Sequence, residues 1–152
     1  MQTFLPYKSF LQSAKVLDYK RLGKQRVEAL QILMALLKVD KDLNPADKES
    51  HWLNHPAVKM WKGYEPALSF YLLIMCEEWL RRGFNSEMHH KVRKLWVDKF
   101  ASLDFVEPEW LTEDFCRAHQ SNLMRKDAKY YGVHFGEDMP DNLEYIWPVG
   151  KA

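Results

Sequence analysis

The sequence predicts an all-α fold, and we expect a compact helical bundle in a single domain that spans residues 1–152. Apolar residues recur at intervals of three and four along residues 9–38, which is the spacing of one helix face. No segment shows the convincing alternation of apolar and polar residues that a half-buried strand requires. Hydrophobic residues make up 47% of the 152 residues, enough for one sizeable core without a metal or disulfide scaffold.

Residues 9–38 are predicted to form two helices that meet near Asp18, a candidate N-cap residue. One apolar stripe runs along this segment. Its members are Leu22, Val27, Leu30, Leu33, Met34 and Leu37.

A polar loop is expected over residues 40–50. The pair His55-Pro56 then predicts the start of a short helix that runs through Trp61, because proline is favoured in the first helical turn.

Pro66 likewise predicts the start of the most apolar helix, which we expect to run to Arg82 and to stop at the C-terminal cap Gly83. A short basic helix is expected from Ser86 to Phe100.

Thr112 is expected to cap a helix that reaches about Lys126. We expect residues 129–132 and an irregular aromatic tail, ending near Trp147, to follow it.

Several protein classes are excluded by simple counts. The longest strictly apolar run, residues 70–76, is seven residues long, whereas a bilayer span needs about 20. Residues 1–6 lack the charged and apolar regions of a signal peptide. The two cysteines form no disulfide framework. We therefore expect a soluble, cytoplasmic protein, and a monomer because nothing in the sequence demands an oligomer.

The charges are segregated along the chain although the net charge is only +1. Residues 1–39 carry seven Lys or Arg and two acids, residues 81–100 carry six and two, and residues 117–131 carry four and one. Such blocks can create a positive face that attracts an anionic ligand. On the pattern alone, ordinary solvated helix faces are the simpler interpretation.

The most informative stretch is residues 21–28. On a helix, Arg21, Lys24 or Gln25, and Glu28 share one face opposite the leucine stripe. A carboxylate among cations can stabilise a developing positive centre, and the cations can bind phosphates. A salt-bridged solvent face is the alternative. Gly23 favours close approach by another group, because glycine inside a helix costs about 1 kcal/mol relative to alanine.

No metal or cofactor is expected. His51 and His55 are four residues apart, but Pro56 disfavours a helix through both of them. Cys76 and Cys116 lack a C-x-x-C partner. No Gly-rich phosphate loop and no G-x-S-x-G motif is present.

Two further features remain open on sequence grounds. His119, in the basic helix with Arg125 and Lys126, is either a buried hydrogen-bonding residue or a ligand contact. The run Lys129-Tyr130-Tyr131 combines phosphate-binding charge with rings that stack on bases, although most aromatic residues must belong to the core.

Three segments taken together resemble the pyrimidine-dimer DNA glycosylase family of the phage endonuclease V type. The clearest is the long helix from Leu73 that ends in the basic pair and Gly-Phe-Asn of residues 81–85. The others are Lys-Tyr-Tyr-Gly at residues 129–132 and the N-terminal order around Tyr19-Lys20-Arg21. The chain is most similar to a bacterial and phage subfamily with the patterns Met-Gln-Thr-Phe-Leu-Pro, Arg-Leu-Gly-Lys-Gln-Arg-Val-Glu and His-Pro-Ala-Val-Lys-Met-Trp.

The resemblance implies an all-α fold whose extended N-terminus threads between helices into the active site. There the α-amine attacks C1′ of the damaged nucleotide, an imine forms, and β-elimination nicks the strand. An α-amine suits this step, because its ordinary pKa of about 7.7–8.0 leaves a nucleophilic fraction near neutral pH. Duplex DNA is the implied partner, with a base extruded from the stack.

Only some of the functional residues that the resemblance implies have a matching residue in this sequence. The short start aligns Met1 with the family's nucleophile, and Gln2, whose large side chain should block removal of Met1, stands where the phage enzyme has arginine. The family's Arg-Glu pair aligns with Arg21-Leu22, so the catalytic glutamate is missing there. We expect Glu28 to replace it, with Asp18 as the second choice.

We therefore expect a DNA glycosylase, with or without AP-lyase activity, that acts on a damaged or modified pyrimidine. The expected catalytic residues are Met1 and Glu28. The expected substrate- and DNA-binding residues are Gln2, Arg21, Lys24, Gln25, Arg26, His55, His119, Arg125, Lys126, Lys129, Tyr130 and Tyr131. The alternatives are a nucleic-acid-binding module without chemistry, and a different enzyme that acts on nucleotides or RNA with the Arg21–Glu28 face and His119 as its pocket.

Overall fold

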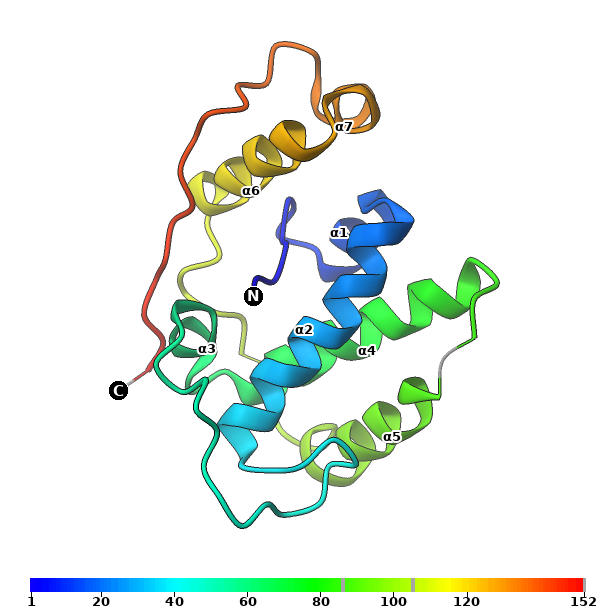
Figure 1. The fold of residues 1–152 in the computed structure, drawn as a ribbon, viewed down its shortest axis with the longest axis vertical. Coiled ribbons are helices and arrows are strands. Elements are labelled where there is room, and N and C mark those ends of the chain that lie inside the picture. Colours follow the sequence, from blue (N-terminus) through cyan, green and yellow to red (C-terminus); the bar gives the residue numbers. More distant parts are fainter. Residues whose placement is uncertain (86, 105, 152) are drawn as a thin grey trace.

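The computed structural model describes residues 1–85, 87–104 and 106–151, and its architecture is all-α (Figure 1). Within these ranges the backbone forms no strand, and a lone antiparallel bridge joins Val39 to Pro45. The elements are α1 (Phe10–Val16), α2 (Tyr19–Leu37), α3 (Pro56–Trp61), α4 (Glu65–Arg81), α5 (Met88–Leu95), the π-helix η1 (Trp96–Phe100), α6 (Glu113–Lys126) and α7 (Ala128–Phe135). The predicted fold class is confirmed.

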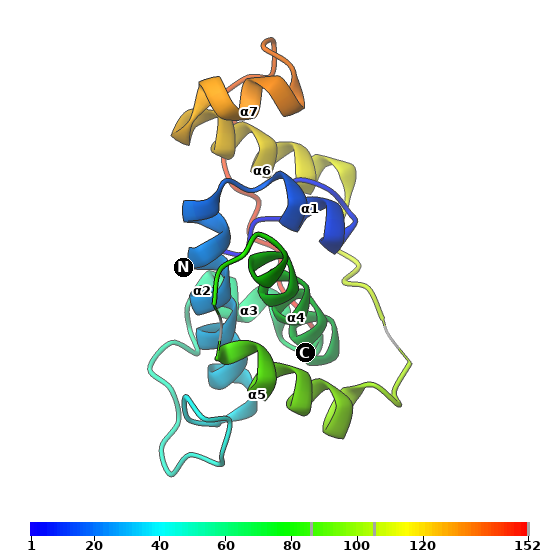
Figure 2. The same ribbon diagram turned by 90° about the vertical axis from the view of Figure 1, so that its right-hand side faces the viewer.

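The core lies where α2 crosses α4, and α1, α3 and α5 close around this pair (Figures 1 and 2). The leucine stripe of α2 supplies Leu22 and Leu33, which are fully buried. Trp61 from α3 and Tyr71 from α4 are the largest side chains in the core. Burial of apolar surface contributes about 25 cal/mol per Å², so side chains of this size are among the largest single contributors to the hydrophobic stabilisation.

Local hydrogen bonds and backbone geometry explain the predicted starts of α6 and α3 and the predicted end of α4. Thr112 Oγ1 accepts a 3.2 Å hydrogen bond from the Phe115 N–H and caps α6. The ring of His55 caps α3 in the same way, with its Nδ1 accepting from the Ala57 N–H at 3.0 Å. Gly83 follows α4 with a φ of +91°, a conformation that favours glycine.

Some details differ from the sequence predictions. Asp18 occupies the N-cap position of α2, but its carboxylate does not cap the helix and instead pairs with Arg21. Residues 129–132 lie inside α7. The basic helix predicted from Ser86 is α5 followed by η1, and Ser86 itself lies outside the described residues.

Two non-helical segments complete the arrangement. Residues 1–5 form neither helix nor strand and run between α6 on one side and α2 and α4 on the other, as the resemblance implies, and the chain bends at residues 6–9 before α1 (Figure 1). The chain after α7 returns along α6 to α3 (Figure 1). None of the described helices is long and apolar enough to cross a membrane.

Candidate active site

The extended N-terminal segment is held by side chains rather than by a neighbouring strand. Four successive backbone N–H groups each donate to a side chain, and these bonds are Gln2 to Glu28 Oε2 (3.2 Å), Thr3 to Gln2 Oε1 (2.8 Å), Phe4 to Gln25 Oε1 (2.8 Å) and Leu5 to His119 Nδ1 (2.9 Å). A buried N–H without an acceptor costs about 1–3 kcal/mol. The four bonds therefore fix both the path and the register of this segment.

Two buried aromatic side chains also form hydrogen bonds with the N-terminal segment. The Tyr71 hydroxyl lies 2.9 Å from the carbonyl oxygen of Phe4 and 2.7 Å from Gln25 Oε1. Burial raises the pKa of Tyr71 well above its ordinary value, so the group stays a neutral donor. Trp61 Nε1 donates to Thr3 Oγ1 at 2.9 Å. Gln25, which the sequence placed on the candidate face, is 1% exposed and joins the segment to α2.

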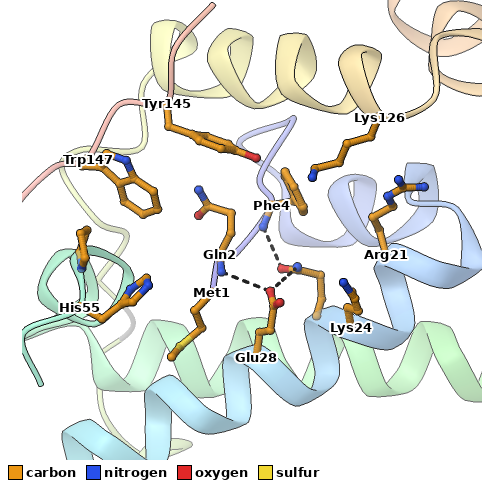
Figure 3. A pocket seen from close by; sticks show the side chains of 12 residues that line it. Met1, Gln2, Phe4, Arg21, Lys24, Glu28, His55, Lys126, Tyr145 and Trp147 are labelled. Atoms are coloured by element: carbon orange, nitrogen blue, oxygen red, sulfur yellow. Dashed lines mark hydrogen bonds between the residues drawn. The ribbon is translucent and has the colours of Figure 1, made fainter. Parts of the chain in front are cut away.

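The first residues of the segment open into a cavity of about 460 Å³ (Figure 3). Its walls come from the N-terminal segment, from α2, from the start of α3, from the end of α6 and from the chain after α7. The lining residues are Met1, Gln2, Phe4, Arg21, Lys24, Gln25, Glu28, His55, Pro56, Lys126, Tyr145 and Trp147. The volume is within the range of pockets that hold small ligands or a nucleotide.

The cavity combines one carboxylate with several cations. Glu28 is the only acid among the described lining residues, and Arg21, Lys24 and Lys126 line the same cavity, although Arg21 also pairs with Asp18 at 3.2 Å. The Gln2 N–H and Gln25 Nε2 donate to the same carboxylate oxygen, Oε2, at 3.2 and 3.4 Å, so neither bond uses Oε1. Such a site can bind phosphates and stabilise a cation that develops beside Glu28.

His55 lines the cavity together with Met1 and Glu28, and their charges act on its ring. Burial lowers the pKa of His55, the charge of the Met1 α-amine lowers it further, and Glu28 opposes this effect. Because its Nδ1 accepts the cap bond from Ala57, the neutral ring carries its proton on Nε2. The structure therefore brings His55 to the same cavity as Met1 and Glu28, and its contact with a substrate stays a prediction.

Two aromatic residues of the cavity, Tyr145 and Trp147, were not predicted as site residues. They belong to residues 141–151, which we call the C-terminal strap. The sequence marked this stretch as an irregular aromatic tail. The one local signal was the spacing of Tyr145 and Trp147 on either side of Ile146, which points two rings to the same side of an extended chain.

Two predicted contact residues are buried instead. His119 is 0% exposed, its pKa is lowered to about 3 by burial, and its Nδ1 accepts from Leu5. Tyr131 is also 0% exposed, and its hydroxyl donates to the Asp18 carboxylate. The expectation that both contact DNA directly is corrected: each of them positions another segment.

Three further residues predicted to contact DNA, Arg125, Lys129 and Tyr130, do not line the cavity. Arg125 is exposed, but its guanidinium donates to the carbonyl oxygens of Asp141 and Leu143 at 2.8 and 3.1 Å and so holds the strap. Lys129 is exposed on α7, next to the half-buried Tyr130.

Arg26 and Gly23 belong to an aromatic stack on the far side of α2. The guanidinium carbon of Arg26 lies 4.2 Å from the centre of the Trp79 ring, and Phe84 stacks on the same ring at 4.2 Å. A Cβ at Gly23 would lie 3.1 Å from the edge of Trp79. The close approach that Gly23 indicates is therefore made by Trp79 and not by a ligand.

Among residues 1–85, 87–104 and 106–151, no group of three or more His, Cys, Asp or Glu side chains is placed to hold a metal ion.

The fold and the cavity together define a small all-α protein whose own N-terminus enters a cationic pocket beside a carboxylate. The sequence profile of the family described as pyrimidine dimer DNA glycosylase matches residues 1–92, and the chain belongs to this family. The matched range contains the N-terminal segment, α2 with Glu28, and α4, whereas α6, α7 and the strap lie beyond it. A search of curated proteins and a search of solved structures each returned no match.

Proposed function

We propose that this protein removes a damaged or modified pyrimidine from duplex DNA by amine chemistry at its N-terminus, followed by AP-lyase strand scission. The observation that supports this most directly is the bond from the Gln2 N–H to Glu28, which holds the residue that follows the α-amine against a carboxylate in a cationic cavity. Family membership makes DNA the substrate class.

In the proposed reaction the neutral α-amine of Met1 attacks C1′ of the target nucleotide. The C1′–N bond to the base breaks, and its electron pair leaves with the base, which takes up a proton. The amine transfers a proton to Glu28, which also stabilises positive charge on the sugar. Glu28 then returns the proton to O4′ as the C1′–O4′ bond breaks, and an imine joins C1′ to Met1.

Strand scission completes the proposed sequence. A proton-accepting group removes a proton from C2′ of the imine. The C3′–O bond then breaks, and the 3′-phosphate group leaves with the electron pair. Water then hydrolyses the imine and frees the amine. Arg21, Lys24 and Lys126 would hold the flanking phosphates, because they line the same cavity as Glu28.

Borohydride trapping tests this proposal. A duplex with one cyclobutane pyrimidine dimer and a duplex with one abasic site are each incubated with the protein and borohydride, and mass spectrometry locates the adduct. We expect an adduct at the Met1 amine on both duplexes and none with protein whose α-amine has been acetylated. An adduct on the abasic duplex alone would keep the amine chemistry and redirect the search to other bases.

A DNA-binding protein without chemistry is the second candidate, since Arg21-Leu22 replaces the family's Arg-Glu pair. It is distinguished by the same experiment. A binding protein gives no adduct on either duplex, and acetylation of its α-amine leaves the affinity for DNA unchanged.

A further inference from the structure

The side-chain amide of Gln25 is bonded at both of its ends. Its Oε1 accepts from the Phe4 N–H at 2.8 Å and lies 2.7 Å from the Tyr71 hydroxyl. Because a backbone N–H can only donate, the amide oxygen faces Phe4 and the amide nitrogen faces away from it. On that other side Nε2 donates to Oε2 of Glu28 at 3.4 Å. Gln25 is 1% exposed, so bulk water does not compete for these bonds.

Gln25 and Glu28 together hold two backbone N–H groups of the N-terminal segment. The two residues are three positions apart on α2, which places both side chains on one face of that helix. Gln25 accepts from Phe4, and Oε2 of Glu28 accepts from the Gln2 N–H at 3.2 Å (Figure 3). Since Gln2 follows Met1 directly, the same two side chains also limit where the α-amine can lie.

The two oxygens of the Glu28 carboxylate are not equivalent. Oε2 accepts from Gln25 Nε2 and from the Gln2 N–H, whereas Oε1 accepts neither of these bonds. Two donors on one oxygen oppose rotation of the carboxylate about its last single bond. Glu28 lines the same cavity as Met1, so Oε1 is the oxygen that stays available to a group in that cavity.

We propose that Gln25 is a positioning residue, which orients Glu28 so that Oε1 takes the proton from the α-amine of Met1. One amide holds the carboxylate through Oε2 and the N-terminal segment through Phe4, so the same side chain aligns the proton acceptor and the nucleophile. Once the amine has attacked C1′, one of its N–H bonds breaks, the electron pair stays on nitrogen, and the proton bonds to Oε1. This inference rests on the proposed function, because it assigns the orientation of two groups in that reaction.

Gln25→Glu tests the donor of the amide alone. Glutamate has nearly the same shape and keeps an acceptor for the Phe4 N–H, but it places an oxygen instead of Nε2 against Glu28. When both carboxylates are charged they repel each other, and Oε2 of Glu28 loses its bond to residue 25. At lower pH the pair shares one proton, because two carboxyl groups in one site do not readily ionise together. The shared proton restores a hydrogen bond between residues 25 and 28.

The measurement is the single-turnover rate of borohydride trapping on an abasic duplex, with protein in saturating excess, at pH 8 and pH 5.5. At pH 8 the rate of Gln25→Glu relative to wild type should fall by about 10- to 100-fold, since a small misplacement of reacting groups costs up to about 10²-fold. At pH 5.5 this relative rate should recover by about fivefold or more, because the pair then shares a proton. The other titratable groups of the cavity, including His55 and the α-amine, are the same in both proteins, so their titration cancels in the ratio.

Gln12→Glu is the matched control for this variant. It makes the same chemical change at an exposed residue of α1 that lies outside the cavity lining. Its trapping rate should match that of the wild type at both pH values.

Tyr71→Phe is the second variant, and it leaves the aromatic ring in the core. The hydroxyl that it removes lies next to Oε1 of Gln25, so the amide becomes freer to move. We expect the trapping rate at saturating protein to fall about threefold or more. The Kd for the duplex should stay unchanged, because Tyr71 is fully buried and cannot contact DNA. Tyr64→Phe, which removes another buried hydroxyl outside the cavity lining, should trap at the wild-type rate.

Two results would overturn the inference. A relative rate of Gln25→Glu that is the same at both pH values would show a structural defect, which does not depend on a shared proton. An unchanged trapping rate in Tyr71→Phe would overturn the inference even if Gln25→Glu failed to fold. Failure of the wild type to trap the abasic duplex would instead count against the proposed function.

Discussion

The backbone N–H of Gln2 donates to Oε2 of Glu28 at 3.2 Å, across 26 positions of sequence. This bond joins the second residue of the chain to the middle of α2, and Gln25 donates to the same oxygen one turn earlier on that helix. The carboxylate therefore both holds the N-terminus and lines the cavity. Any substitution at Glu28 has to be designed so that these two roles are separated.

Glu28→Gln separates them, because the amide oxygen still accepts from the Gln2 N–H while the charge and the proton acceptor are lost. We expect single-turnover cleavage to fall by about 10²–10⁴-fold, as for loss of a general base. The Kd for the duplex should not increase, because removing a negative charge cannot weaken attraction to phosphates. Quench-flow kinetics and fluorescence anisotropy measure the two quantities.

The control for this variant is Glu49→Gln, which makes the same chemical change at an exposed site outside the cavity. It should behave as wild type in both measurements. If binding and cleavage decline together in Glu28→Gln, the carboxylate acts by holding the N-terminus and not on the sugar.

Lys126 points from the end of α6 toward the cavity (Figure 3), and a phosphate contact there would add to the salt dependence of DNA binding. Lys126→Ala should reduce the slope of log K against log salt concentration by about 1, because one fewer counterion is released. Lys99→Ala, exposed on η1, should leave the slope unchanged. Equal slopes for the wild type, Lys126→Ala and Lys99→Ala would show that Lys126 does not contact a phosphate.

Local signals in the sequence were sufficient for most of the fold. Pro56, Thr112 and Gly83 mark helix ends through backbone geometry that depends on neighbours within four residues. The helix α7 was missed because its cap, Asp127, lies in a basic run and Gly132 interrupts the helical pattern. The Asp127 carboxylate accepts from the Tyr130 N–H at 3.1 Å and starts that helix.

The candidate site was less predictable because long-range bonds build it. Glu28 could be predicted from helix spacing together with the family resemblance. His119 could not be assigned, since its role depends on a bond to Leu5, 114 residues away. The positions of Tyr145 and Trp147 depend on the contacts of the strap with α6 and α3. The spacing of apolar residues along the sequence does not predict such contacts.

His119 makes stability depend on pH. Burial lowers its pKa from 6.5 to about 3 in the folded protein, so the unfolded chain binds a proton at a higher pH than the folded protein does. The stability is fully present above pH 6.5 and is lost as the pH falls toward 3, by about 1.4 kcal/mol per unit. His119→Asn keeps an acceptor for Leu5 but does not titrate. Urea unfolding at pH 7, 5 and 4 should therefore show a steeper decline for wild type than for the variant. Identical pH profiles would contradict this account of the buried ring.

Gly23→Ala tests the close contact between α2 and α4. Alanine would normally stabilise a helix interior by about 1 kcal/mol, but the new Cβ would lie 3.1 Å from Trp79. That ring is held by Arg26 and Phe84, and its Nε1 donates to the Asn85 carbonyl oxygen at 3.1 Å. We expect a net loss of about 1 kcal/mol in the free energy of unfolding. In a Trp79→Leu background the same change should be neutral or stabilising, and equal effects in both backgrounds would show that the ring is not the obstacle.

Gly150→Ala tests whether the strap is held by its end. A Cβ at this position would lie 2.2 Å from the carbonyl oxygen of Lys62, which follows α3, and 2.9 Å from that of Lys59 within α3, and such backbone atoms cannot move aside as a flexible side chain can. The Gly150 N–H should therefore lose its 2.9 Å bond to the Lys59 carbonyl oxygen, which frees the end of the strap while the helical core stays folded. We expect Trp147 to become more accessible to acrylamide quenching and the strap to be cleaved faster by a protease, with little change in the thermal midpoint of the core. Val149→Ala, at a neighbouring residue that is 79% exposed, should change neither quantity. Unchanged quenching and unchanged proteolysis in Gly150→Ala would show that the bond to Lys59 does not hold the strap.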